Sequence, residues 1–380
     1  GKGSYVFENG NEYHGEWKED KMEGEGIYAA SNGNYFEGTF NDGKLNGQGT
    51  FRSSIGETYK GEWVQGRMNG RGLYIFVNGN RYDGEWVDDK RIGYGIYTYV
   101  NGDLYEGYFS DGKRNGKGTF RDKSGDIYEG NWKEGQMDGQ GYHFFANGDT
   151  YNGQWAKNKK TGNGVFSFAD GSEYEGSFLN DQMEGLGTFT YPDGRRFNGN
   201  WLEGKMEGYG TFSDLKGNRY EGDWKDNTYN GNGTFYFANG DQYEGEWKSS
   251  KYDGHGTFTD LDGNKYIGLW HQGLKHGQGT LYSSNTDKYV GVWLKDLRHG
   301  EGTQTYANGD QYEGEWVANK KSGKGLMKYI SGAIYDGEWK LDMKHGTGTF
   351  DDKNGNLFNG YWANNKKDGK GEMTYPNGDI

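Results

Sequence analysis

Aromatic and polar residues alternate along this chain in short stretches that predict β-strands. In Tyr243-Glu-Gly-Glu-Trp247 the aromatic residues and the glycine fall on one parity and the acids on the other. In Gly254-His-Gly-Thr-Phe258 the glycines and the phenylalanine again share one parity. A period of two is typical of a strand that buries one face. We therefore expect two strands here, joined by a loop at residues 248–253.

These two strands recur as one unit through the whole sequence. An Asn-Gly pair precedes the first strand at Asn239-Gly240, where glycine supplies the positive φ of a tight turn. Two strands and two turns predict a β-hairpin, and a fixed period of 23 residues is typical of a repeat array. The aromatic residue that opens each copy occurs sixteen times without insertion or deletion, at Tyr13, Phe36, Tyr59, Tyr82, Tyr105, Tyr128, Tyr151, Tyr174, Phe197, Tyr220, Tyr243, Tyr266, Tyr289, Tyr312, Tyr335 and Phe358.

The repeat predicts an all-β fold, in which tandem hairpins form an elongated, twisted, single-layer ribbon similar to a solenoid. With two strands per repeat and about 4.8 Å between strands, such a ribbon would extend for roughly 160 Å. The many glycines oppose helices, at roughly 1 kcal/mol each. We expect one continuous array of about 16.5 repeats over residues 1–380. Residues 1–12 and 359–380 are then partial repeats at the cut ends of a segment of a longer protein.

The repeat assigns glycine and tryptophan to structure. All 13 tryptophans occupy one repeat position, and none of the 72 glycines lies out of register. Glycine inside a strand usually marks the close approach of another group. We expect Gly245, Gly254 and Gly256 to leave room for flat aromatic rings from adjacent hairpins.

Composition narrows the class of protein. Apolar residues make up 31% of the chain and charged residues 26%, which is close to the range of disordered chains, but 17% of the residues are aromatic. Aromatic side chains bury large areas, so a thin core of stacked rings is predicted. The net charge of −13 disfavours nucleic acid and anionic membranes as partners. There is no cysteine to form disulfides, and no apolar run approaches the ~20 residues of a membrane span.

No motif in the repeat predicts catalysis, a metal site or a cofactor. The Gly-x-Gly pairs resemble part of a phosphate loop but lack the helix that must follow it, and Gly116-Lys-Gly118 also lacks the Walker spacing. Paired acids such as Glu244 and Glu246 fall on the solvent parity of a strand, so we interpret them as a solvated face rather than an acid/base pair. His276 and His299 belong to adjacent repeats, about 10 Å apart by strand spacing, which is far for one zinc ion. We therefore expect no enzymatic activity in this segment.

One loop position carries pairs of basic residues along an edge of the expected ribbon. The pairs are Lys90 and Arg91, Lys113 and Arg114, Lys159 and Lys160, Lys320 and Lys321, and Lys366 and Lys367. One interpretation is a basic edge for acidic partners such as tubulin tails or phosphoinositides. The other is scattered solubilising charge that also protects the sheet edge from further pairing.

The most informative departure from the repeat lies in residues 266–305. Solvent-parity positions that are otherwise mostly polar here carry Ile267, Leu269, Val290 and Val292. A contiguous exposed aliphatic patch is usually an interaction site. We predict that these four residues dock another protein. The alternatives are that a segment of the same protein covers them, or that the change is neutral.

Two stretches carry a resemblance to a known family. Asn239-Gly-Asp-Gln-Tyr-Glu-Gly-Glu-Trp247 and Met206-Glu-Gly-Tyr-Gly-Thr-Phe212 resemble MORN (membrane occupation and recognition nexus) repeats, and the resemblance extends over the whole chain. It implies β-hairpin ribbons that act as scaffolds, and long arrays of this family without other domains are typically cytoskeletal or ciliary. Thr286, in place of a turn glycine, and Gln304, at a mostly aromatic position, depart from the pattern.

From these features we predict a non-enzymatic scaffold or spacer of the cytoplasm, in a ciliary, axonemal or other cytoskeletal assembly. Its expected partners are cytoskeletal or ciliary proteins, including a second copy of the chain, and not nucleic acid. Membrane binding is disfavoured by the net charge but stays as one alternative, a tether that binds phosphoinositides through the basic loop edge. The other alternative is the regulatory repeat region of an enzyme whose catalytic domain lies outside this segment.

Overall fold

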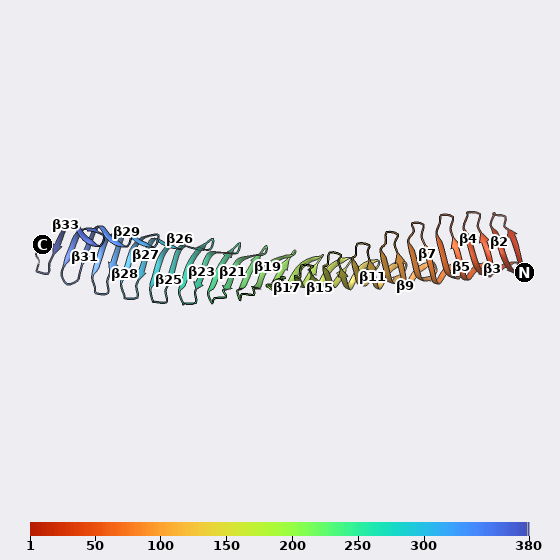
Figure 1. The fold of residues 1–380 in the computed structure, drawn as a ribbon, viewed down its shortest axis with the longest axis horizontal. Helices are drawn as coiled ribbons and strands as arrows, with labels where there is room; N and C mark the ends of the chain where they lie inside the picture. Colours follow the sequence, from red (N-terminus) through yellow and green to blue (C-terminus); the bar gives the residue numbers. More distant parts are fainter. Residues whose placement is uncertain (378, 380) are drawn as a thin grey trace. The chain divides into compact units, whose positions relative to one another are not determined.

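The computed structural model describes residues 1–377 and 379, which fall into two compact units, residues 1–192 and residues 193–380. The described residues form 33 strands and no helix. Within each unit, consecutive strands pair antiparallel and lie side by side in one layer (Figure 1). The all-β fold class and the 23-residue hairpin unit are confirmed, whereas one continuous array over residues 1–380 stays a prediction.

In unit 1 short strands of seven residues alternate with long strands of nine, after a first strand of five. The short strands are β2 (Glu12–Lys18), β4 (Tyr35–Asn41), β6 (Thr58–Val64), β8 (Arg81–Val87), β10 (Leu104–Ser110), β12 (Ile127–Lys133), β14 (Thr150–Ala156) and β16 (Glu173–Leu179). The first strand is β1 (Lys2–Val6), and the long strands are β3 (Lys21–Ala29), β5 (Lys44–Arg52), β7 (Arg67–Ile75), β9 (Lys90–Thr98), β11 (Lys113–Arg121), β13 (Gln136–Phe144), β15 (Lys159–Ser167) and β17 (Gln182–Thr190).

Unit 2 continues the same alternation. Its short strands are β18 (Arg196–Leu202), β20 (Arg219–Lys225), β22 (Gln242–Lys248), β24 (Lys265–His271), β26 (Lys288–Leu294), β28 (Gln311–Val317), β30 (Ile334–Lys340) and β32 (Leu357–Ala363). Its long strands are β19 (Lys205–Ser213), β21 (Thr228–Tyr236), β23 (Lys251–Thr259), β25 (Leu274–Tyr282), β27 (Leu297–Thr305), β29 (Lys320–Lys328), β31 (Met343–Asp351) and β33 (Lys366–Thr374).

The connection inside a hairpin is shorter than the sequence pattern predicts. β22 and β23 are joined only by Ser249 and Ser250, with φ of 49° and 60°. Two consecutive positive φ angles give a type I′ turn, whose twist matches that of the flanking strands. The prediction of a loop over residues 248–253 is therefore wrong in length. A serine pair does not predict this turn, because positive φ angles are more typical of Asn and Gly.

The connection between hairpins is a turn closed by glycine, as expected. Gly240 has a φ of 96°, and its N–H donates to the carbonyl of Phe237 at 3.0 Å. The Phe237 N–H in turn donates to the carbonyl of Asp241 at 2.9 Å. At the equivalent position Thr286 keeps the turn with a φ of 72°, a conformation that is unfavourable for a β-branched residue.

A bulge in each long strand sets the register of the hairpin. Tyr243 pairs with Phe258 and Gly245 with Gly256, and then the register shifts so that Trp247 pairs with Tyr252. The extra residues lie on β23. They include Gly254, whose φ of 103° is readily adopted only by glycine.

Two of the three glycines expected to accommodate aromatic rings do so. A Cβ at Gly256 would lie 2.3 Å from Oη of Tyr243, and one at Gly245 would lie 2.4 Å from Cα of Gly256. The ring thus lies across both glycines, and it belongs to their own hairpin rather than an adjacent one. For Gly254 the prediction is wrong, because its Cβ would meet the side chain of Glu246 instead of a ring.

The rings form a thin core on one side of the sheet. The opening aromatic residue of every repeat except Phe36 is buried, as are all tryptophans except Trp17. We call this side the aromatic face, and the opposite side, which carries Glu244 and Glu246, the polar face. Because the core is one layer of side chains deep, each hairpin depends on its two neighbours for burial.

Gly256→Ala tests this packing. The added methyl group has no space beside the buried Tyr243 ring, so we expect β22–β24 to lose about 2 kcal/mol of local stability. Hydrogen exchange measured by mass spectrometry should show faster exchange in these strands and little change in unit 1. His255→Ala, at an exposed position one residue away, serves as the control. Unchanged exchange in Gly256→Ala would contradict the ring-over-glycine arrangement.

Candidate protein-docking site

On the aromatic face, tyrosine and tryptophan side chains pack against one another and donate to backbone carbonyls, as the hairpin of Tyr243 illustrates. Tyr243 contacts Trp247 of its own hairpin with ring centroids 5.1 Å apart, and Trp270 of the next hairpin at 5.5 Å, both edge to face. Its hydroxyl donates to the carbonyl of Glu246 at 2.9 Å, and Trp270 Nε1 donates to the carbonyl of Gly256 at 3.2 Å. Burial raises the pKa of Tyr243, so the hydroxyl stays a neutral donor. These residues serve the structure.

The residues predicted to form a basic loop edge divide into two sets with different surroundings. The first residue of each pair is exposed: Lys90, Lys113, Lys159, Lys320 and Lys366. The second residue of each pair lies beside aromatic rings: Arg91, Arg114, Lys160, Lys321 and Lys367. For example, Arg114 Cζ is 4.1 Å from the ring centroid of Trp132, and Lys321 Nζ is 4.5 Å from that of Trp339. The ten side chains therefore do not share one surface.

Acids of the following turn face the exposed set. Lys90 pairs with Asp111 at 2.5 Å, and Lys113 pairs with Glu134 at 2.5 Å. In unit 2, Lys320 pairs with an acid at 2.7 Å in the same way. Exposed ion pairs of this kind contribute little to stability, but they offset the positive charge of the edge.

Lys344 occupies the ring-facing position in a repeat that the sequence pattern did not single out. Its Nζ lies 4.4 Å from the ring centroid of Phe350 and 5.1 Å from that of Trp362. The backbone N–H of Lys344 donates to the side chain of Asn365 in the following turn. At the equivalent position of the preceding repeat, the N–H of Lys321 donates to the carboxylate of Asp342. Burial lowers the pKa of Lys344 to about 8, and the nearby charge of Lys321 adds to the effect. A half-buried ammonium group without a carboxylate is a weak point of this hairpin.

The four aliphatic residues predicted to dock a protein come together on the polar face of unit 2. Ile267 of β24 and Val290 of β26 both pair with Thr280 of β25, which lies between them. Ile267 is 42% exposed and Val290 41% exposed. Leu269 and Val292, two residues further along the same strands, are half-buried. The four residues and Thr280 form one patch, which we call the aliphatic patch.

The paired acids of the polar face have a structural role beyond solubility. Glu246 accepts a hydrogen bond from the backbone N–H of His255 at 2.8 Å, and Glu315 accepts one from Lys324 at 3.0 Å. Both N–H groups belong to the bulge of the long strand, so these acids satisfy backbone donors that the register shift leaves over.

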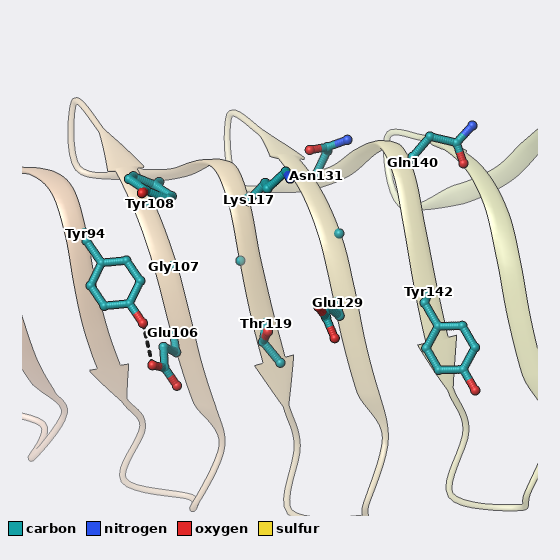
Figure 2. Close-up of a pocket in the computed structure, with 12 residues that line it drawn as sticks. Tyr94, Glu106, Gly107, Tyr108, Lys117, Thr119, Glu129, Asn131, Gln140 and Tyr142 are labelled. Carbon is teal, nitrogen blue, oxygen red and sulfur yellow. Dashed lines mark hydrogen bonds between the residues drawn. The ribbon is translucent and has the colours of Figure 1, made fainter.

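A hollow of about 660 Å³ on the polar face of unit 1 is lined by tyrosines that the sequence prediction missed. Figure 2 shows Tyr94 reaching from β9 toward Glu106 on β10, with Tyr142 at the far side. The Tyr94 hydroxyl donates a hydrogen bond to Glu106, and its ring meets that of Tyr108 edge to face at 5.7 Å. The missed signal is tyrosine at solvent-parity positions that are otherwise mostly polar.

Within residues 1–377 and 379, no group of three or more His, Cys, Asp or Glu residues could hold a metal ion. The same residues contain no helix long and apolar enough to cross a membrane.

Comparison with known proteins gives one strong match. A family model described as MORN repeat matches sixteen successive stretches, from residues 13–35 to residues 358–380. No curated protein matches the chain.

Several solved structures share a low similarity with the chain. The TCP domain of SAS-4 (dCPAP) from Drosophila melanogaster, in complex with a proline-rich motif of Ana2 (dSTIL), is 13% identical. That match covers 53% of this chain and 90% of the other, with a TM-score of 0.25. The TCP10 domain of CPAP from Danio rerio is 12% identical over 70% of this chain and 99% of the other, with a TM-score of 0.17. Matches at these scores support no conclusion about this chain.

The environment of Lys344 predicts a pH-dependent stability. Its pKa is lower in the folded chain than in the unfolded chain, where a lysine titrates near 10.4, so the unfolded state binds more protons between about pH 8 and pH 10. Stability of the hairpin should therefore rise across this window. Lys344→Met, with a side chain that other repeats carry at this position, should remove the rise and add about 1 kcal/mol at pH 7.

Hydrogen exchange of β31 and β32, compared between Lys344→Met and the native chain at each pH, measures this difference. Lys340→Met, at an exposed position, is the matched control. If the native chain and Lys344→Met differ by the same amount at pH 7 and pH 10, the group does not titrate as proposed.

Proposed function

The chain belongs to the MORN repeat family, and from this premise we propose that it is a non-enzymatic scaffold that docks other proteins on its polar face. The aliphatic patch carries the proposal. On the aromatic face, rings and glycines maintain the hairpins and are not free to bind a partner. The polar face varies from repeat to repeat, and at Ile267, Leu269, Val290 and Val292 it becomes aliphatic on two neighbouring hairpins.

An exposed aliphatic patch bounded by polar residues supports protein docking. Apolar surface gains free energy when a partner removes it from water, and contiguous patches of this kind mark interaction sites. The two exposed residues, Ile267 and Val290, lie on alternate strands with only Thr280 between them. Their side chains are therefore close enough to contact one partner side chain or two adjacent ones.

We further propose a cytoplasmic place for this scaffold in a ciliary or other cytoskeletal assembly, with cytoskeletal proteins or a second copy of the chain as partners. The support is the resemblance of this long array to cytoskeletal and ciliary members of the family. A regulatory region attached to an enzyme stays an alternative hypothesis, which sequence outside residues 1–380 would test.

The alternative of a phosphoinositide tether has less support. Of the ten basic side chains that it requires, five lie beside aromatic rings and three of the others pair with acids. Lys159 and Lys366 are the exposed members outside these pairs. The net charge of −13 also opposes an anionic surface.

The double substitution Ile267→Glu with Val292→Glu tests the docking function. Two carboxylates in the aliphatic patch should reduce binding of proteins captured from a ciliated-cell extract by tenfold or more. In the docked complex each carboxylate would be buried without an opposite charge to pair with. Quantitative mass spectrometry of proteins retained by the immobilised chain provides the measurement. The matched control, Asn152→Glu with Ser177→Glu, adds the same charge at the same two repeat positions of adjacent hairpins in unit 1.

Circular dichroism would first establish that both variants keep their strands. The docking role at this patch is wrong if the double variant and the native chain retain the same proteins in the same amounts.

A further inference from the structure

We propose that β22–β28 bind a helical segment of another protein that has aliphatic side chains at its centre and basic side chains toward both ends. This inference rests on the proposed docking function. It goes further by naming the chemistry, the length and the orientation of the partner segment.

A single row of side chains across seven strands carries the proposal. Each residue of the row pairs directly with the next one on the neighbouring strand. In strand order from β22 to β28, the row is Glu244, Thr257, Ile267, Thr280, Val290, Thr303 and Glu313. The row is symmetric in character, with two aliphatic residues at the centre, threonines between all larger side chains, and an acid at each end.

The centre of the row is widened by the other half of the aliphatic patch. Leu269 lies over Gly277, where a Cβ would be 2.9 Å from its side chain, and Val292 lies over Gly300 at 3.4 Å. The glycines leave room for both aliphatic side chains to lie close to the sheet. The patch therefore extends about 10 Å across the strands and about 7 Å along them.

The acids at the ends are available to a partner. The side-chain carboxylates of Glu244 and Glu313 form no ion pair or hydrogen bond with any described residue, and both side chains are exposed. Six strand spacings separate them, which is about 29 Å. Each lies two strands from the nearest aliphatic residue of the row. A basic side chain on either side of an apolar centre would meet an acid there.

Two lysines distinguish the two long sides of the site. Lys265 and Lys288 lie on the same face, two residues before Ile267 and Val290 on their strands. Both are exposed. An acidic side chain on one flank of the partner segment would face them, so the charges fix the direction in which the segment lies as well as its position.

A helix fits this surface better than an extended segment. Every strand from β23 to β27 is paired on both sides, so the face offers no backbone groups to an added strand. A helix satisfies its own backbone, and its diameter of about 10 Å covers the width of the aliphatic patch. At 1.5 Å per residue, the separation of the two acids corresponds to a helix of about 19 residues.

Synthetic helical peptides of about 20 residues test the proposal with the full chain. The first probe carries leucines on one face at its centre, lysines at both ends and glutamates along one flank. The second is identical except that glutamates replace the end lysines. Fluorescence anisotropy at low salt should show that the lysine-ended peptide binds on the order of tenfold more tightly than the glutamate-ended one.

A charge exchange in the protein gives the decisive comparison. Glu244→Lys with Glu313→Lys should reverse the preference, so that the glutamate-ended peptide becomes the tighter ligand. The control is Glu129→Lys with Glu175→Lys, which makes the same change at the same repeat position in unit 1 and should leave the preference unchanged. All four positions are exposed, and circular dichroism checks that the variants keep their strands.

Several outcomes would overturn the proposal. The first is equal binding of the two peptides, or no binding of either, and the second is a preference that the charge exchange leaves in place. A dimer in light scattering that Ile267→Glu with Val292→Glu dissociates would identify a second copy of the chain as the occupant instead. Patch-dependent binding to phosphoinositide vesicles would identify a membrane.

The failure of this inference is separable from that of the proposed function. If Ile267→Glu with Val292→Glu loses the captured proteins while neither peptide binds, the docking function stands and the proposal of a helical partner is wrong. If the peptides bind as expected but capture does not depend on the patch, the proposed function is wrong at this site.

Discussion

The contact on which nearly every hairpin depends is an aromatic ring, in most cases of tyrosine, lying across a pair of glycines. In the hairpin of Tyr243, any side chain larger than hydrogen at Gly245 or Gly256 would occupy the volume of the ring or of the opposite backbone. The same ring is held edge to face by tryptophans of two successive hairpins. One side chain therefore joins its own two strands and also joins that hairpin to the next. A sheet one layer thick can bury a core in this way, because flat rings need little depth.

Because of this constraint, the two faces of the sheet differ in how freely their residues can vary. The aromatic face must keep the same residue types at the same spacing, and donors such as Tyr243 Oη and Trp270 Nε1 are bound to backbone carbonyls. The polar face has only to stay compatible with a strand, apart from acids such as Glu246 that satisfy the bulge. Variation from repeat to repeat is therefore free to accumulate on the polar face. That is where the aliphatic patch and the tyrosine-lined hollow lie.

The sequence predicted those features that follow from alternation and period. The alternation that places Tyr243, Trp247 and Phe258 on one side predicted the strands. The same alternation predicted that Ile267 and Val290 lie on the face opposite the rings. Alternation fails at the bulge, where an extra pair of residues changes which side Gly254 faces. The sequence pattern also assigned Arg114 to a loop. In the structure the type I′ turn is so short that Arg114 belongs to a long strand, and its side chain lies over the ring of Trp132. The position of Glu244 and Glu313 at the two ends of one row across seven strands could be recognised only from the strand register.

The edge-to-edge order of the strands within each unit has a mechanical consequence. Tension applied between the first and last strands of a unit would act along the direction of the backbone hydrogen bonds. Those bonds would be loaded a few at a time, as in the opening of a zipper, and would not resist together as they do when strands slide past one another. Each hairpin that opened would release its 23 residues, or about 78 Å of extended chain at 3.4 Å per residue. Within a unit, the repeat would then yield in small and nearly equal steps, so that length under load would report how many hairpins remain closed.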